Sequence, residues 1–387
     1  MIYRSPEGGL YRVPLSGGSA EPFGLWVNEF LLSPDGQWLV VWTQDAMLVS
    51  APVAGGAVAQ LGGGLAQSDQ YAVSPDSRSV VYIAGDDATS RLVRVPIAGG
   101  EPVVLSPLPG DAMGVGSFAI TPDSAYAVFT IEEPLRARGF SIASTPLDGG
   151  QPIMLWDEQQ NGPASDWLSL SPDGQNVLFS ADAANGIRQH FAVPVRGGPA
   201  TAIGDPLAEP GRIVGAAVLG DQVLYAAQQS DDQSDELYRA PLSGGAALRL
   251  SGPRPFAGKL FFQVAPRSGQ VVFAADLVTP GEVGLYSVPV AGGAATLLSA
   301  QIPPGASVEQ FILSADQSLA VFAIYAGTRS GFAAIYAARL DGSQLWQVLG
   351  GGAIVEFRLL PDGRLLYQAD ADRDGITELF VTPLANQ

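Results

Sequence analysis

One short motif recurs nine times along the 387-residue chain, and its spacing constrains the fold more than any other feature. Each copy is a proline, two variable residues and a pair of glycines, or a close variant of that pattern. The first glycine stands at positions 17, 55, 99, 149, 197, 244, 292 and 342, and Asn386 takes its place in the last copy. A period of 38 to 50 residues, built from short apolar runs and tight turns, predicts an array of similar small sheets.

Each repeat contains the signals of four antiparallel strands, which we name A to D. An apolar run such as residues 30–32 enters a Pro-Asp turn, where proline presets one backbone angle and Asp or Gly accepts the others. A β-branched or aromatic run such as 38–42 follows as strand B. Strand C ends in a proline, as at Pro96 and Pro241, because proline cannot donate to a ladder. A short strand D follows the glycine pair, as at 101–105 and 246–250.

Two stretches carry a resemblance to a known family. The Ser-Pro-Asp-Gly turns at 33–36 and 171–174, together with Asp-Arg-Asp-Gly-Ile-Thr-Glu-Leu-Phe-Val at 372–381, resemble the TolB-like propellers built from WD40-like Pro-Asp repeats. The resemblance covers nearly the whole chain and implies an all-β protein with a single closed β-propeller domain over residues 1–387. Such propellers occur in colicin-translocation proteins, as gating domains of peptidases and in secreted bacterial proteins, so the resemblance also implies a periplasmic or secreted location.

The number of blades follows from the strand count. The sequence predicts nine B and nine C strands, but only eight A and eight D strands, because it opens on strand B at 2–4 and stops at a C-to-D turn. We therefore expect eight to nine blades, with nine favoured, and a distorted ring with imperfect closure between the termini. In an eight-bladed ring, residues 20–23 would supply the missing strand D. Three turns, at 219–221, 265–269 and 314–316, depart from the Pro-Asp pattern, so we expect the motif aspartate to be structural.

The charge balance limits the partners. Lys and Arg number 20 against 38 Asp and Glu, and the net charge of -18 opposes binding to nucleic acid. No apolar run is long enough to insert into a membrane. Most acidic residues are expected on the B-to-C and D-to-A loops, where they either serve solubility or attract cations or a basic partner. They include Asp86, Asp87, Glu132, Glu133, Asp157, Glu158, Asp231, Asp232, Asp235 and Glu236.

One loop offers a weak calcium candidate. Asp370, Asp372 and Asp374 alternate as in the first half of a calcium-binding loop. Val381 stands where the bidentate glutamate would be required, and the same place is commonly a plain turn in the family that the chain resembles. We therefore expect no cofactor. The absence of cysteine removes disulfides and thiolate ligands.

The sequence shows no set of catalytic residues. The only histidine is His190, in a strand, where a structural role is expected, and no Gly-x-Ser-x-Gly elbow occurs. The glycine triplets at 62–64 and 350–352 are expected to be loops, and aromatic residues such as Trp42 and Phe273 are expected to pack between blades. These observations favour a non-catalytic scaffold that binds a protein or peptide through the acidic loop face or the central channel. Two alternatives remain: a propeller hydrolase or lyase with its site at the channel mouth, and the gating propeller of a peptidase without its hydrolase domain.

Overall fold

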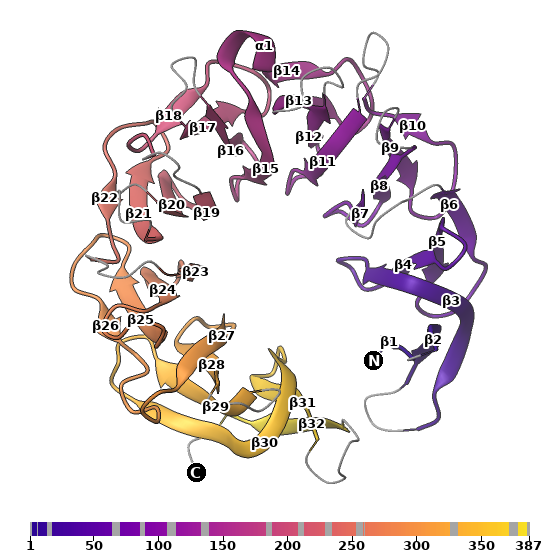
Figure 1. Ribbon diagram of the computed structural model, residues 1–387. Helices are drawn as coiled ribbons and strands as arrows, with labels where there is room; N and C mark the ends of the chain where they lie inside the picture. Colours follow the sequence, from indigo (N-terminus) through magenta and orange to yellow (C-terminus); the bar gives the residue numbers. More distant parts are fainter. Residues whose placement is uncertain are drawn as a thin grey trace. The chain divides into compact units, whose positions relative to one another are not determined.

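The structure is a computed structural model, and it describes residues 2–5, 7–13, 18–63, 70–85, 90–106, 114–132, 139–182, 188–207, 213–228, 234–252, 258, 260–325, 332–370 and 378–384. The chain divides into two compact units, Met1–Ala202 and Ile203–Gln387. Both consist of antiparallel sheets that follow one another in chain order (Figure 1). The all-β prediction is confirmed.

The first unit contains five groups of strands and one short helix. Its elements are β1 (Ile2–Arg4), β2 (Gly9–Arg12), β3 (Glu21–Leu32), β4 (Trp38–Thr43), β5 (Met47–Pro52), β6 (Ala59–Gly63), β7 (Tyr71–Val73), β8 (Ser79–Ala84), β9 (Arg91–Pro96), β10 (Val103–Val104), β11 (Gly114–Ile120), β12 (Tyr126–Glu132), β13 (Phe140–Pro146), β14 (Ile153–Trp156), α1 (Glu158–Asn161), β15 (Ala164–Leu170), β16 (Asn176–Asp182), β17 (Arg188–Pro194) and β18 (Thr201–Ile203). The predicted first strand at residues 2–4 is β1, and the predicted strand ending at Pro96 is β9.

The second unit repeats the same pattern. Its strands are β19 (Ile213–Leu219), β20 (Gln222–Ala227), β21 (Glu236–Pro241), β22 (Leu248–Arg249), β23 (Phe261–Ala265), β24 (Gln270–Ala275), β25 (Gly284–Pro289), β26 (Thr296–Leu297), β27 (Ser307–Leu313), β28 (Leu319–Tyr325), β29 (Phe332–Arg339), β30 (Leu345–Leu359), β31 (Arg364–Asp370) and β32 (Glu378–Pro383). The D strands β10 and β22 are shorter than the sequence predicted, since each keeps only two ladder residues.

Two long strands each belong to two sheets. The first half of β3 pairs with β2, and from Val27 onward the same strand pairs with β4. In the second unit β30 pairs mainly with β29 before the glycine triplet and with β31 after it. Residues 20–23, considered above as a possible strand D, thus lie mostly within β3 and pair with the N-terminal hairpin. The number of blades remains a prediction.

Gly62, Gly63 and the triplet at 350–352 are in strands, which corrects the sequence prediction of loops; Gly64 lies outside the described residues. Gly62 and Gly63 belong to β6, and residues 350–352 lie inside β30. A Cβ atom on Gly62 would lie 2.4 Å from the Tyr82 hydroxyl oxygen, so glycine is needed there to let the tyrosine pack against the strand. A close approach of this kind explains glycine within a strand without a turn.

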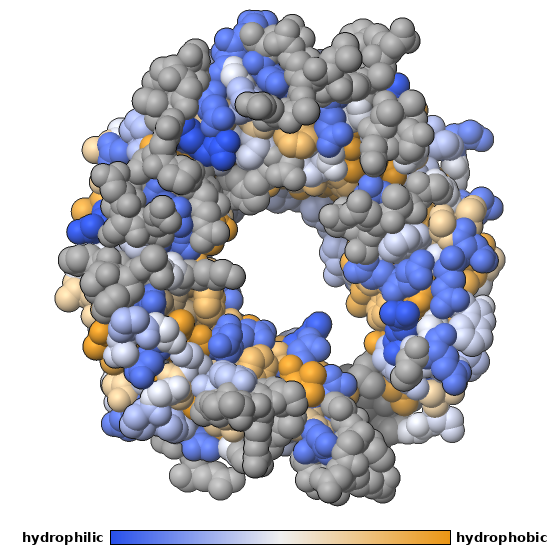
Figure 2. Space-filling model, viewed as in Figure 1, coloured by the Kyte–Doolittle hydropathy of each residue, from blue (hydrophilic) through white to orange (hydrophobic). Residues whose placement is uncertain are grey.

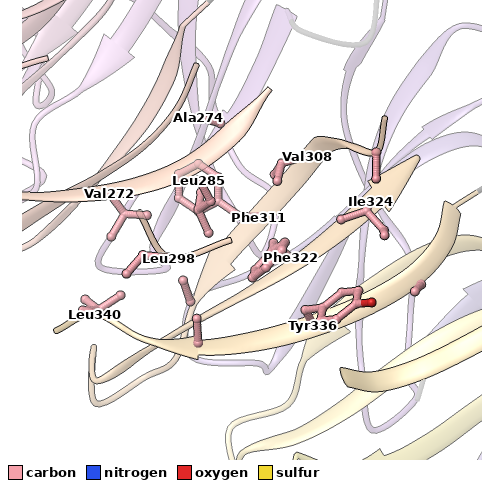
Figure 3. Close-up of a cluster of buried hydrophobic side chains, with 14 of the residues drawn as sticks. Val272, Ala274, Leu285, Leu298, Val308, Phe311, Phe322, Ile324, Tyr336 and Leu340 are labelled. Atoms are coloured by element: carbon pink, nitrogen blue, oxygen red, sulfur yellow. The ribbon is translucent and has the colours of Figure 1, made fainter. Parts of the chain in front are cut away.

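The core of each unit lies between successive sheets. Directly opposed residues of strands B and C stack their aromatic rings at centroid distances of 5.2 to 5.8 Å. In the described residues these pairs are Tyr3–Tyr11, Phe179–Phe191, Tyr225–Tyr238, Phe273–Tyr286, Phe322–Tyr336 and Tyr367–Phe380. Phe322 and Tyr336 belong to one buried cluster with Val272, Ala274 and Leu285 of the preceding sheet (Figure 3). Packing between sheets, expected for the aromatic residues, is confirmed for this cluster.

The Pro-Asp turns are closed by the aspartate itself. The hydroxyls of Ser33, Ser74, Thr121, Ser171 and Ser314 each donate to the aspartate two residues later, at 2.5 to 2.6 Å. The turn at 314–316 lacks proline but makes the same bond, so the hydroxyl and the carboxylate define this turn. These hydroxyls and the backbone N–H groups lower the pKa of Asp35, Asp123, Asp173 and Asp316 below the usual range. The structural role expected for the motif aspartate is confirmed.

Buried serines on strand C tie neighbouring sheets together. The Ser144 hydroxyl donates to the Val195 carbonyl oxygen of the next sheet at 2.6 Å, and Ser287 donates to Leu340 at the same distance. Ser50 makes the equivalent bond to Ile97. Each accepting carbonyl directly precedes or lies within a C-to-D turn, so these bonds fix the turns of adjacent sheets.

Candidate functional site

A groove runs between the A strands β19 and β23 of the second unit. Its volume is about 530 Å³, which lies in the size range of sites that bind small molecules or short peptides. It is lined by residues 214–217 of β19, by 260–264 in and beside β23, and by Ala226 of β20. The lining is mainly aliphatic and aromatic, with Gln263 as its polar side chain.

Missing side chains open the groove. Gly215 lies directly opposite Ala226, and a Cβ atom on Gly215 would meet nothing within 4 Å. The corresponding pairs of A and B strands elsewhere are larger: Glu29–Trp42, Phe261–Ala274, Gln310–Ala323 and Glu356–Gln368. Glycine and alanine at Gly215 and Ala226 therefore leave space that a larger side chain of strand A or strand B fills in these four sheets.

Two hydrophobic side chains at the groove are exposed. The ladder between β19 and β20 shifts between Ile213 and Gly215, so Val214 is the extra residue of a β-bulge. Its side chain is 41% exposed, and Phe261 on the opposite strand is 38% exposed. Phe261 is held in place by stacking on Phe311 of β27, with ring centroids 5.5 Å apart. Figure 2 shows hydrophobic residues at several separate places on the viewed face.

A polar contact supports the wall formed by β23. The side-chain amide of Gln263 donates to the Phe311 carbonyl oxygen at 3.1 Å, which links β23 to β27. The Gln263 side chain is only partly buried. It therefore places an amide oxygen beside an otherwise apolar lining, where a ligand N–H group would find an acceptor.

Buried acids lie close to one end of the groove. Gly258 precedes the lining residue Leu260 by two positions, and its carbonyl oxygen accepts a hydrogen bond of 3.4 Å from the Asp235 N–H group. A Cβ atom on Gly258 would lie 2.4 Å from a carboxylate oxygen of Asp276. Both aspartates are buried, and the Gln228 side-chain amide donates to Asp235 at 3.0 Å.

The acidic surface predicted from the loops is wrong for two of its members. Asp235 and Glu236 are both buried. Glu236 forms hydrogen bonds with two side chains of its own sheet. The Arg249 guanidinium donates to Glu236 at 2.9 Å, and the Tyr238 hydroxyl donates to its other carboxylate oxygen. Burial, together with the Glu236 carboxylate, raises the pKa of Tyr238. These acids are structural parts of the strand end and do not form an exposed attractive surface.

Other members of the predicted acidic surface divide into two groups. Glu132, Asp157 and Glu158 are half-buried. Asp86, Asp87, Glu133, Asp231 and Asp232 lie outside the described residues. The calcium candidates also divide: Asp370 is the last residue of β31 and is half-buried, whereas Asp372 and Asp374 lie outside the described residues.

His190 and the arrangement of the acidic side chains bear on catalysis and on metal binding. His190 is buried in β17, and burial lowers its pKa to about 3, so the imidazole is neutral at ordinary pH. Within the described ranges no group of three or more His, Asp or Glu side chains is arranged to hold a metal ion. In that same part of the chain no helix has the length and apolar character to cross a membrane.

The groove is suited to noncovalent binding of an extended segment with apolar side chains. Val214, Phe261 and Gln263 offer two hydrophobic contacts and one hydrogen-bonding group on rigid strands. Sequence reasoning missed these residues. The available signal was the run of small residues at 215–217, in a strand where the other repeats carry larger side chains.

Comparison with known proteins adds the fold class. No protein-family profile matches the sequence, and no curated protein matches it either. Among solved structures the chain is similar to Porphyromonas gingivalis dipeptidyl peptidase 4, with 13% identity and a TM-score of 0.62 over 89% of this chain and 56% of that one. It is also similar to a prolyl endopeptidase, with 13% identity and a TM-score of 0.50 over 86% of this chain and 52% of that one.

The fold is that of a β-propeller, which both matched peptidase structures share over this region. The chain spans just over half the length of each of these two structures. At 13% identity the similarity concerns the fold and carries no residue roles from the peptidases to this chain.

Proposed function

We propose that this chain is a non-catalytic β-propeller that binds an extended peptide, with the groove between β19 and β23 as its binding site. The observation that carries the proposal is the space left at Gly215 and Ala226, bordered by the exposed Val214 and Phe261 side chains. Rigid apolar walls bind a peptide by burying its side chains, and Gln263 offers a hydrogen bond to its backbone. This proposal replaces the acidic loop face with an apolar groove as the preferred surface.

Filling the groove tests this proposal. The probe is a fluorescein-labelled octapeptide, Gly-Leu-Ala-Pro-Phe-Ala-Leu-Gly, and binding is followed by fluorescence anisotropy. Gly215→Trp places an indole in the groove, and we expect it to weaken binding by about tenfold or more, equivalent to about 1.4 kcal/mol. Gly215→Ala is the matched control, because it alters the same backbone position yet leaves most of the space, and we expect its affinity to stay within about twofold of the parent.

Two results would contradict the proposal. Equal binding by the parent and Gly215→Trp, with both variants folded by circular dichroism, would remove the groove as the site. Cleavage of the peptide, followed by chromatography and mass spectrometry and abolished by a single acidic substitution, would contradict the non-catalytic role.

A second candidate function is the gating propeller of a peptidase. It is favoured by the two structural neighbours, both of which are peptidases that extend well beyond the region matched here. In that role the groove would hold a peptide before cleavage by a separate hydrolase segment. The coding sequence on either side of this chain tests this candidate: an adjoining segment with a Gly-x-Ser-x-Gly elbow supports it, and unrelated neighbouring sequence contradicts it.

A further inference from the structure

A second, smaller cavity opens at the loop end of the sheet β23–β26. Its volume is about 200 Å³, and its walls come from the loops at 278–284 and 299–306, with Tyr286 and Leu297 between them. The space is smaller than sites for drug-sized molecules and matches a single side chain. All of its lining residues are described, and none of them lines the groove between β19 and β23.

Hydrogen bonds hold the cavity walls in place. The Ser307 hydroxyl accepts from the Val283 N–H group at 3.2 Å and donates to the Gly281 carbonyl at 2.9 Å. Val308 N–H donates to the Val283 carbonyl at 2.8 Å. These bonds tie the B-to-C loop of one sheet to the first residues of the next sheet. The cavity is thus pre-formed, which reduces the entropy that a ligand loses on binding.

The hydroxyl of a mostly buried tyrosine at the cavity makes no hydrogen bond in the described part of the chain, and the oxygen itself remains accessible. The Tyr286 side chain is 7% exposed, and among the described residues its hydroxyl makes no hydrogen bond. The equivalent hydroxyls of Tyr238 and Tyr336 are satisfied within their own sheets, by Glu236 and by Gln347. Tyr286 thus differs from both equivalents in facing a cavity.

Gly284 leaves room for the Tyr286 hydroxyl beside the cavity. A Cβ atom on Gly284, a cavity-lining residue, would lie 3.0 Å from the Tyr286 hydroxyl oxygen. Burial, and then the charge of Asp276, raises the pKa of Tyr286, so the hydroxyl keeps its proton at physiological pH. It is a ready hydrogen-bond donor for an acceptor group that enters the cavity.

The charges around the cavity select the ligand. Glu282 lines the cavity, is exposed, and forms no ion pair within the described part of the chain. Asp276 adds a buried negative charge near Tyr286, and the whole chain carries a net charge of -18. An anionic ligand is therefore disfavoured, and a cation beside Glu282 is favoured. Val278, 75% exposed at the same rim, extends the apolar surface.

We propose that this cavity binds one branched aliphatic side chain of a peptide or protein partner whose next residue is Arg or Lys. The aliphatic group fills the cavity, the adjacent backbone carbonyl accepts the Tyr286 hydroxyl, and the cation lies beside Glu282. This site goes beyond the peptide groove, because it uses a different set of residues and selects for charge.

The first test fills the cavity from its rim. Ala300 lines the cavity and is exposed, so Ala300→Trp blocks it without entering the core. Ala294→Trp, also exposed but outside the lining, is the matched control. The probe is acetyl-Gly-Leu-Arg-Gly-amide, and saturation-transfer difference NMR measures contact of the leucine methyl groups with the protein.

We expect saturation transfer to the leucine methyls with the parent and with Ala294→Trp, and loss of it with Ala300→Trp. Acetyl-Gly-Leu-Glu-Gly-amide lacks the cation, and acetyl-Gly-Ala-Arg-Gly-amide lacks the branched aliphatic side chain. We expect each of them to bind at least about fivefold more weakly than the Leu-Arg peptide. Equal signals for the three peptides, or an unchanged signal with Ala300→Trp, would overturn the proposal.

A second variant keeps the test decisive if Ala300→Trp misfolds. Tyr286→Phe removes only the hydroxyl, and we expect about 2- to 10-fold weaker binding of the Leu-Arg peptide, the range of one neutral hydrogen bond. Its thermal midpoint should not fall, since the hydroxyl has no internal partner to lose. Unchanged affinity, or a lower midpoint, contradicts the proposal. Gly215→Trp should leave this binding intact, so failure of the groove and failure of the cavity are separable.

Discussion

Replacing Ser144 by alanine should destabilise the first unit measurably. The Ser144 side chain is fully buried, and its hydroxyl donates to the Val195 carbonyl oxygen at 2.6 Å. Val195 is itself 2% exposed, so Ser144→Ala leaves a buried carbonyl oxygen without this partner. Such an orphaned acceptor costs about 1 to 3 kcal/mol. For a unit of this size, each kcal/mol lowers the melting temperature by roughly 2 to 4 °C.

The measurement is thermal and urea unfolding followed by circular dichroism at pH 7. Ser19→Ala is the matched control, because Ser19 is exposed, and a surface change of this kind stays within about 0.5 kcal/mol. Ser287→Ala removes the equivalent bond to Leu340 in the second unit and should show a loss of the same order. If Ser144→Ala behaves like Ser19→Ala, the idea that buried serines tie neighbouring sheets together is refuted.

Three further predictions concern the turns, the histidine and the core. Gly198 has a φ of 146°, and a Cβ atom there would lie 3.3 Å from Pro194, so Gly198→Ala should lower the urea midpoint more than Gly36→Ala, whose Cβ position is open. Burial lowers the pKa of His190 from its ordinary value of 6.5 to about 3 in the folded protein, so the stability that depends on the neutral imidazole is complete above about pH 6.5 and is lost as the pH falls toward 3. His190→Leu should therefore shrink the drop in melting temperature between about pH 7 and pH 4. An unchanged drop would contradict this. Phe322→Ala should cost about 3 to 5 kcal/mol in denaturant unfolding, and a loss below about 1 kcal/mol would show that this cluster is not a packed core.

Local patterns in the sequence predicted the strands well. Proline at the end of strand C and the Ser/Thr-x-Asp turn act over a few residues, so Pro96, Pro241 and Asp173 could be placed without knowing their neighbours. The stacked aromatic pairs occupy equivalent positions in successive repeats. Phe273 of one strand B stacks on Tyr286 of its strand C, as Phe322 stacks on Tyr336 in the next repeat.

The candidate sites could not be predicted in this way, because they depend on which residues neighbouring strands and neighbouring sheets bring together. The space at Gly215 arises because this residue pairs with Ala226 on the next strand. The buried Glu236 carboxylate is paired with the Arg249 guanidinium, thirteen residues later in the chain. The sequence predicted a loop at Gly62, because it contains no sign that the Tyr82 hydroxyl lies where a Cβ atom of residue 62 would be. Each of these contacts joins different strands, and no short sequence pattern encodes it.

The shared strands β3 and β30 have a consequence for how the protein comes apart. Local opening of a folded protein commonly involves one contiguous unit, such as a single sheet of an array. Because β3 continues without a loop from one sheet into the next, and β30 does the same, separating either terminal sheet requires distorting a continuous strand. Amide protons of these two strands should therefore exchange with solvent together with those of the adjoining sheet, so that each terminal sheet opens as one cooperative body with its neighbour.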